Sequence, residues 1–265
     1  MEKILNKEEI EEIETRRDYL VVKSNELIQK SRFDLTLPEQ KTVAFICSLI
    51  KPIKQEDSIN GIPFQLEYDF NIRDYCKICG INYNSGKNYA EVKATLKKLS
   101  DRSMWVEFGD EEVLCRWLAK VRTNKKSGIA HIKVDEDLVP YLFDLRKRFT
   151  QYGLYNILGM KSAFSVRLYE LMKSYIKQQY MVFDLEELKR LFMVEDVKSY
   201  HRFPDFRRKV LEIALREINE LTDITVSYDI AKKGNKVVKI KFYIVEKEIT
   251  ERMIAHGKIC DLLTP

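Results

Sequence analysis

The chain has 265 residues, of which 45% are hydrophobic and 11% aromatic, enough to bury the core of one large or two ordinary domains. The formal net charge is +5; the first 19 residues hold four basic and seven acidic side chains, a net of −3, so the remaining residues carry +8. This basic excess suits a polyanionic partner. No run of about 18 apolar residues or apolar signal segment is present, so we expect a cytoplasmic protein with no membrane partner.

In chain order, residues 1–19 are expected to form a charged leader that either docks on the body or stays mobile. The globular part begins at residue 20, and Pro38 suits the first turn of a helix. Residues 64–70 alternate apolar and polar side chains, which is the period of a half-buried strand, and residues 72–79 follow as a short helix.

The next segment predicts a helix with one apolar and one basic side. Over residues 85–100 the apolar stripe consists of Tyr89, Val92, Leu96 and Leu99, and the opposite side carries lysines. Two strand-like segments, residues 104–108 and 113–122, then flank a turn at Gly109-Asp110 and predict a hairpin. A basic turn leads to a last strand at residues 129–134.

The five cysteines are predicted to be reduced thiols, because nothing in the sequence indicates a secreted protein. Cys76 and Cys79 form a single CxxC, but a zinc site needs about four ligands and the nearest histidine is His131. We therefore interpret the pair as two thiols on a short helix and expect no metal and no cofactor.

The second half opens after a connection over residues 146–159, within which we place the domain boundary. Residues 161–178 carry apolar side chains at helical spacing, residues 180–183 form a short strand, and residues 185–192 form a second helix. Residues 249–265 are expected to be a weakly held tail.

Residues 201–221 combine a strong helix start with a basic face. Pro204 suits the first helical turn, and Asp205 is favourable at the positive end of the helix dipole. The apolar face consists of Phe206, Val210, Ile213, Ala214 and Leu221. The opposite side carries Arg208, Lys209, Glu212 and Arg216. Arg207 lies at an edge of the first turn, from which it can still project outward, so this helix should present a mainly cationic surface.

Two strands follow, residues 224–230 and 237–245, around a turn at Gly234-Asn235 with lysines at its tip. A helix followed by a basic hairpin is the outline of a winged helix, with the helix in the DNA major groove and the hairpin on the backbone. The same order of elements occurs in the first half. The sequence thus predicts an α+β protein with two tandem winged-helix domains.

Several motifs give the chain a family resemblance over about residues 20–248. They are NELIQKSRFDLTLPEQK (25–41), FTQYGLY (149–155), SAFSVRLYELMKSY (162–175), FDLEELKRLF (183–192) and FPDFRRKVLEIALREINELTDITVSY (203–228). In this combination the chain resembles the replication initiators of iteron-containing, theta-replicating plasmids. The second half carries the more specific motifs, whereas the first half matches mainly by layout.

The resemblance implies two winged-helix domains in pseudo-twofold arrangement: residues 20–150 for dimerisation and DNA backbone contact, and residues 151–248 for sequence-specific DNA binding. It implies that monomers bind direct repeats in double-stranded DNA at the plasmid origin and open it. It also implies that a homodimer in equilibrium with the monomer represses the protein's own gene, and that host replication proteins are partners.

Candidate site residues follow from the resemblance together with charge. The resemblance makes Arg207 and Arg208 the base-reading candidates, with Arg202, Tyr200 and Ser199 as helpers and Lys209 as a candidate for contact with the DNA backbone. Arginine forks can bridge O6 and N7 of guanine. Lysines at the wing tip should touch phosphate: Lys232, Lys233 and Lys236. A second basic surface is expected in the first domain from Lys87, Lys93, Lys97, Arg122, Lys125 and Lys126.

Other interpretations remain open. One alternative is that the basic helices are solvated faces. Two alternative functions are a winged-helix transcriptional repressor without initiator activity and a nucleic-acid-processing enzyme. The loop at residues 80–87 has five rather than four residues between its glycines and lacks the Ser or Thr of a phosphate-binding loop. No histidine pair of the HxH type occurs, and Glu186, Glu187, Glu212, Glu217 and Glu220 are interpreted as solvated pairing groups. We therefore expect no catalytic residue and no enzyme activity.

Overall fold

The computed structural model describes residues 7–50, 64–81, 86–108, 111–143, 145 and 148–263. The predicted turn at Gly109-Asp110 and residues 82–85 of the loop at residues 80–87 lie outside this part of the chain. Within it, no helix has the length and apolar character that crossing a bilayer requires.

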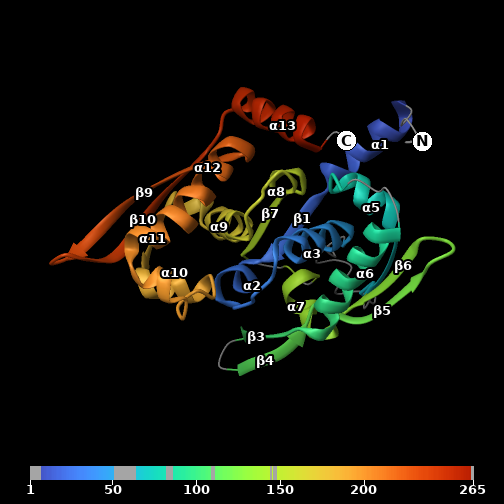
Figure 1. The fold of residues 1–265 in the computed structure, drawn as a ribbon, viewed down its shortest axis with the longest axis horizontal. Coiled ribbons are helices and arrows are strands. Elements are labelled where there is room, and N and C mark those ends of the chain that lie inside the picture. Colours follow the sequence, from blue (N-terminus) through green and yellow to red (C-terminus); the bar gives the residue numbers. More distant parts are fainter. Residues whose placement is uncertain are drawn as a thin grey trace.

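The described chain contains both helices and strands in each half (Figure 1). The first half contains α1 (Lys7–Arg17), β1 (Leu20–Ser24), α2 (Asn25–Lys30), α3 (Leu37–Leu49), β2 (Glu67–Asn71), α5 (Ile72–Ile78), α6 (Gly86–Asp101), β3 (Ser103–Phe108), β4 (Glu111–Arg116), β5 (Leu118–Asn124), β6 (Ile129–Val134) and α7 (Val139–Leu142). The second half contains β7 (Phe149–Gly153), α8 (Tyr155–Leu158), α9 (Ala163–Ser174), β8 (Tyr180–Asp184), α10 (Leu185–Leu191), α11 (Phe203–Phe206), α12 (Glu212–Leu221), β9 (Ile224–Lys233), β10 (Lys236–Glu246) and α13 (Ile249–Leu263).

The first half forms a winged-helix unit. Helices α3, α5 and α6 accompany an antiparallel three-stranded sheet of order β2-β6-β5, and the β5–β6 hairpin is its wing. Val92, Leu96 and Leu99 of α6 are buried, as the predicted stripe requires, whereas Tyr89 is half-buried. Helix α6 therefore turns its lysine-bearing side outward.

The prediction for the hairpin after α6 is wrong in the extent of its second strand. The segment expected to be continuous over residues 113–122 is divided at Trp117, where β4 ends and β5 begins. Trp117 and Leu118 are consecutive and both are buried, which an alternating strand does not allow. The chain therefore bends through the core at Trp117. Strands β3 and β4 form a separate two-stranded sheet, and β5 pairs with β6 as the wing.

The second half repeats the order of helix, strand, two helices and two strands. Helix α9 is followed by β8, α10 and the helical segment at residues 203–221, and the sheet has the order β8-β10-β9. This order corresponds to β2-β6-β5 in the first unit. The predicted α+β fold with two winged-helix units is thus confirmed.

A buried polar join connects the two units. Strand β1 pairs antiparallel with β7, and α9 packs against α2, α3 and α12. Inside this join the Lys23 Nζ lies 2.6 Å from Oε1 of Glu170, and both side chains are at most 5% exposed. Tyr152 donates to the same carboxylate, and burial raises the pKa of Tyr152 well above its usual value.

The two ends of the described chain lie side by side (Figure 1). Arg17 of α1 donates through Nε to the carbonyl oxygen of Ile78 (3.0 Å) and through Nη2 to that of Leu263 (3.2 Å). The described part of the charged leader is thus docked. Residues 249–263 form a helix with Ala255, Ile259 and Leu263 buried, which differs from the weakly held tail that the sequence predicted.

Candidate nucleic-acid interface

Residues 203–221 form one continuous helical segment with an internal wide turn. Pro204 lies in the first turn of α11, and a π-helical turn at Arg207–Leu211 joins α11 to α12. Phe206 is completely buried beneath the segment, with ring centroids 6.4 Å from Phe192 and 6.3 Å from Tyr200. Because this anchor fixes one face, the residues that follow it project outward.

The predicted base-reading arginines are exposed and paired. The exposed fractions are 80% for Arg202, 50% for Arg207 and 70% for Arg208. The Arg207 Nε lies 3.0 Å from Glu212 Oε1, and the Arg208 Nη2 lies 3.3 Å from Asp205 Oδ1. Arg202 approaches the second oxygen of Asp205 at 3.9 Å. Each guanidinium therefore contacts a carboxylate at the surface rather than in the core, and Lys209 is exposed beside them.

The segment before the helix brings its two predicted helpers to different environments. A short 3-10 turn over Lys198–His201 carries both residues. Ser199 is exposed, whereas Tyr200 is half-buried against Phe206. Tyr200 therefore also supports the helix from below.

The wing of the second unit is long and narrow. Lys233 pairs with Lys236 across a two-residue loop, in which Gly234 has φ +61°. A positive φ at the first loop position favours glycine and matches the twist of a hairpin. Lys232, Lys233 and Lys236 are all exposed at the tip, and the wing extends away from the body of the molecule (Figure 1).

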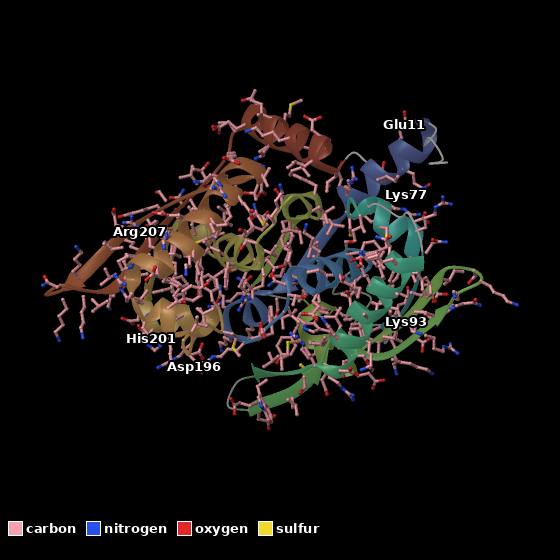
Figure 2. All side chains as sticks on the ribbon, viewed as in Figure 1. Glu11, Lys77, Lys93, Asp196, His201 and Arg207 are labelled. Carbon is pink, nitrogen blue, oxygen red and sulfur yellow. The ribbon has the colours of Figure 1, made fainter. Side chains whose placement is uncertain are left out.

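The first unit carries its predicted cations on α6 and the β5–β6 hairpin. All six are exposed: Lys87, Lys93, Lys97, Arg122, Lys125 and Lys126. Lys97 pairs with Asp101, and the Lys87 Nζ lies 3.9 Å from Glu91 Oε1. Lys93 and Arg207 lie toward opposite ends of the long axis (Figure 2). The basic residues thus form two separate surfaces, one on each winged unit.

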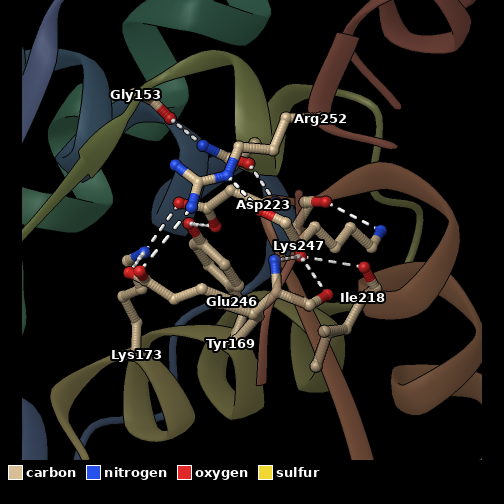
Figure 3. A network of polar contacts seen from close by, with 11 residues as sticks. Gly153, Tyr169, Lys173, Ile218, Asp223, Glu246, Lys247 and Arg252 are labelled. Carbon is tan, nitrogen blue, oxygen red and sulfur yellow. Dashed lines mark hydrogen bonds and ion pairs between the residues drawn. The ribbon is translucent and has the colours of Figure 1, made fainter. Parts of the chain in front are cut away.

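A buried network, which the sequence did not reveal, fixes the far end of the helix (Figure 3). Asp223, just after α12, accepts from the Tyr169 hydroxyl (2.8 Å) and from the Lys173 Nζ (2.7 Å). The backbone N–H of Asp223 donates to Asn156 Oδ1 at 3.0 Å. Burial and the Asp223 carboxylate raise the pKa of Tyr169 well above its usual value. The network ties the helix end to α8 and α9.

Glu217 corrects the prediction that the carboxylates of this region are solvated. It is 8% exposed and accepts from the backbone N–H groups of Lys161 and Ser162 at 3.2–3.3 Å. These groups lie at the start of α9, where backbone donors need partners. Glu217 therefore joins α12 to α9 instead of facing water, because tertiary packing placed it on the inner side of the helix.

The CxxC thiols are core side chains. Cys76 and Cys79 are at most 4% exposed, and burial raises the pKa of each to about 12. A metal-binding or nucleophilic thiol must be deprotonated, and such a pKa opposes that. Within the described ranges, no group of three or more His, Cys, Asp or Glu side chains is placed to hold a metal ion.

Two family models cover most of the chain. The model for Initiator Replication protein, WH1, matches residues 20–173, and the model for Initiator Rep protein, WH2, matches residues 184–244.

The chain is also similar to two curated proteins and to one solved structure. An uncharacterized 27.6 kDa protein of Escherichia coli is 24% identical over 255 residues, covering 94% of this chain and 99% of its own. A replication initiation protein of Escherichia coli is 23% identical over 236 residues, covering 86% and 70%. The crystal structure of the Pi initiator protein in complex with iteron DNA is 22% identical, with a TM-score of 0.69, covering 88% of this chain and 99% of that chain.

Proposed function

This chain belongs to the family of plasmid replication initiators with two winged-helix domains, and from that membership we propose that it binds direct repeats in double-stranded DNA at a plasmid origin and starts replication there. One similar structure is described as an initiator in complex with iteron DNA, and one relative is named a replication initiation protein. Both descriptions favour an initiator over a winged-helix protein that only represses transcription. The same names support an activity that rests on DNA binding rather than on covalent chemistry.

The observation that carries the proposal is the exposed arginine cluster at the start of a well-anchored helix. Arg207 and Arg208 project from the helical segment that the buried Phe206 anchors to the core. The wing with lysines at its tip belongs to the same unit. A helix that enters the major groove contacts base edges with its N-terminal residues. We therefore assign sequence reading to residues 151–248, with Arg207 and Arg208 on guanines and Lys232, Lys233 and Lys236 on phosphates.

The first unit is proposed to contact the DNA backbone. The basic side chains of α6 are lysines, which act as point charges rather than as bidentate forks. Arg122, Lys125 and Lys126 add positive charge on the β5–β6 wing of the same unit. Residues 20–150 should therefore add affinity on a neighbouring stretch of duplex without adding much sequence preference.

A homodimer is proposed to form through the β3–β4 hairpin and to repress the protein's own gene. Trp105 and Leu114 are register partners on the outer face of this hairpin and are 57% and 51% exposed. Glu112 and Arg116 flank Leu114 on the same exposed face. If two copies of β4 pair antiparallel about Leu114, Glu112 of one copy lies opposite Arg116 of the partner subunit, a self-complementary arrangement suited to a twofold interface.

The test compares binding to an origin duplex that carries direct repeats with binding to a scrambled duplex of equal length. The wild-type chain should prefer the repeats by at least about a thousandfold at physiological salt, as specific DNA-binding proteins do. Addition to a supercoiled origin plasmid should make nearby thymines reactive to permanganate. The control is Lys258→Ala, which removes an exposed positive charge on α13.

Each possible result has a distinct meaning. Specific binding without permanganate reactivity would leave the repressor alternative. Metal-dependent strand nicking would support an enzyme. Equal affinity for repeats and scrambled DNA would overturn the proposal. Loss of dimer in Leu114→Arg, with repeat binding retained, would support the β3–β4 interface.

A further inference from the structure

Every arginine at the start of the candidate DNA-reading helix faces a carboxylate of the same segment. Asp205 lies between Arg202 and Arg208 and uses one oxygen toward each, at 3.9 and 3.3 Å. Asp205 is only 23% exposed, whereas its two partners are 80% and 70% exposed. The carboxylate is therefore largely covered, whereas the two guanidiniums extend past it toward solvent.

The second pair depends on the wide turn. The backbone N–H of Glu212 donates to the carbonyl oxygen of Arg207, five residues earlier. In a regular α-helix, residues three and four apart are neighbours, and residues five apart are not. The π turn at Arg207–Leu211 brings Arg207 and Glu212 together, with Nε 3.0 Å from Oε1. The irregular backbone thus lies at the position where the arginines are displayed.

We propose that Asp205 and Glu212 are specificity-determining residues, an inference that rests on the proposed function. Their carboxylates restrain the neighbouring guanidiniums from binding phosphate and leave them able to bind bases; the guanidiniums are those of Arg202, Arg207 and Arg208. The reason lies in the donor geometry of the guanidinium. Arginine has five N–H donors in a planar fork, so one edge can stay on a carboxylate while another bridges O6 and N7 of guanine. On the target sequence the ion pair and the base contact therefore coexist.

On random DNA the guanidiniums have no matching guanine, and only phosphates compete with the carboxylates for them. A guanidinium that turns to a phosphate leaves Asp205 or Glu212 unpaired beside a polyanion, and this repulsion lowers the affinity. Exposed ion pairs are individually weak, so the carboxylates do not prevent binding outright. Their effect is a difference between two affinities, which is how specificity arises.

The test measures affinity of the full chain for a repeat duplex and for a scrambled duplex across a range of salt concentrations. The variants are Asp205→Asn and Glu212→Gln, and the matched control is Glu220→Gln, an exposed carboxylate of the same helix. Each test variant should bind scrambled DNA more tightly and repeats no more tightly than wild type, so that the preference falls about tenfold. The salt dependence on scrambled DNA should steepen by up to about 0.9 for each additional phosphate neutralised.

Additional variants keep the result interpretable. Asp205→Glu retains the charge and should restore most of the preference, which a purely structural role of Asp205 would not explain. Glu212 is 47% exposed, so Glu212→Gln tests the idea even if changes at Asp205 disturb the fold. Parallel gains on both DNAs, equal to those of Glu220→Gln, would overturn the inference. If the wild-type chain itself lacks a preference, the proposed function fails first, and the two failures are thus distinguishable.

Discussion

The two winged units share an order of elements but differ in the chemistry of their exposed helices. The second unit displays Arg207 and Arg208 at a π turn, and the first displays Lys93 and Lys97 on the regular helix α6. Arginine offers a rigid fork that matches guanine, whereas lysine offers a mobile point charge that suits phosphate. The comparison indicates that the same fold can read the DNA sequence in one unit and bind the DNA backbone in the other. The difference lies in the type of cationic side chain and in the local backbone conformation.

The largest expected effect comes from removing the anchor of the second unit. Phe206→Ala deletes a fully buried ring and should lower the free energy of unfolding by about 3–5 kcal/mol. Both tryptophans, Trp105 and Trp117, lie in the first unit, so their fluorescence reports that unit alone, while circular dichroism reports both. Because of the buried join, we expect the urea midpoints of both signals to shift together.

An unchanged tryptophan midpoint beside a shifted dichroism midpoint would mean that the two units unfold independently. Leu96→Ala, a fully buried position of α6, provides the reciprocal perturbation from the first unit and should cost about 2–5 kcal/mol.

The join itself can be broken by Glu170→Gln. This change leaves the Lys23 ammonium buried without its counter-charge, which should cost about 3 kcal/mol and separate the tryptophan and dichroism transitions. Glu220→Gln removes an exposed carboxylate and should change stability by less than about 0.5 kcal/mol. A loss of similar size in both variants would contradict the structural role of the Lys23–Glu170 pair.

The comparison of cations can be sharpened without changing net charge. Arg208→Lys keeps the charge but removes the fork, so repeat affinity should fall by about 1–3 kcal/mol while scrambled-DNA affinity stays constant. Lys93→Arg in the first unit should leave the preference for repeats unchanged. Fluorescence anisotropy on both duplexes measures the effect, and a retained preference in Arg208→Lys would argue against base reading by this residue.

The smallest expected effect concerns the first unit. Lys93→Ala should weaken binding to repeats and scrambled DNA by the same factor and should reduce the slope of log affinity against log salt by about 0.9. The slope is obtained from DNA titrations at salt concentrations from about 50 to about 200 mM. A loss confined to repeats would assign sequence reading to both units and remove the contrast between them.

Much of the second unit was predictable because its signals are local. Pro204 at a helix start and Gly234 in a two-residue loop impose their conformations almost independently of context. The exposed placement of Arg207 and Arg208 followed from the apolar spacing around Phe206 and Val210. The break at Trp117 does not follow from the alternation of residues 113–122, although the adjacent apolar residues Trp117 and Leu118 interrupt that alternation and could have indicated it.

The sequence by itself determined the fold class, the two repeated units and the side of each helix that carries positive charge, because periodicity and turn residues act over a few neighbouring positions. Only the tertiary structure decided that α13 packs as a helix and that Glu170, Glu217 and Asp223 are buried partners rather than solvated charges. It also decided that Arg207 meets Glu212 across a π turn. These features depend on which surfaces meet from distant parts of the chain, and a local pattern of residues does not encode that information.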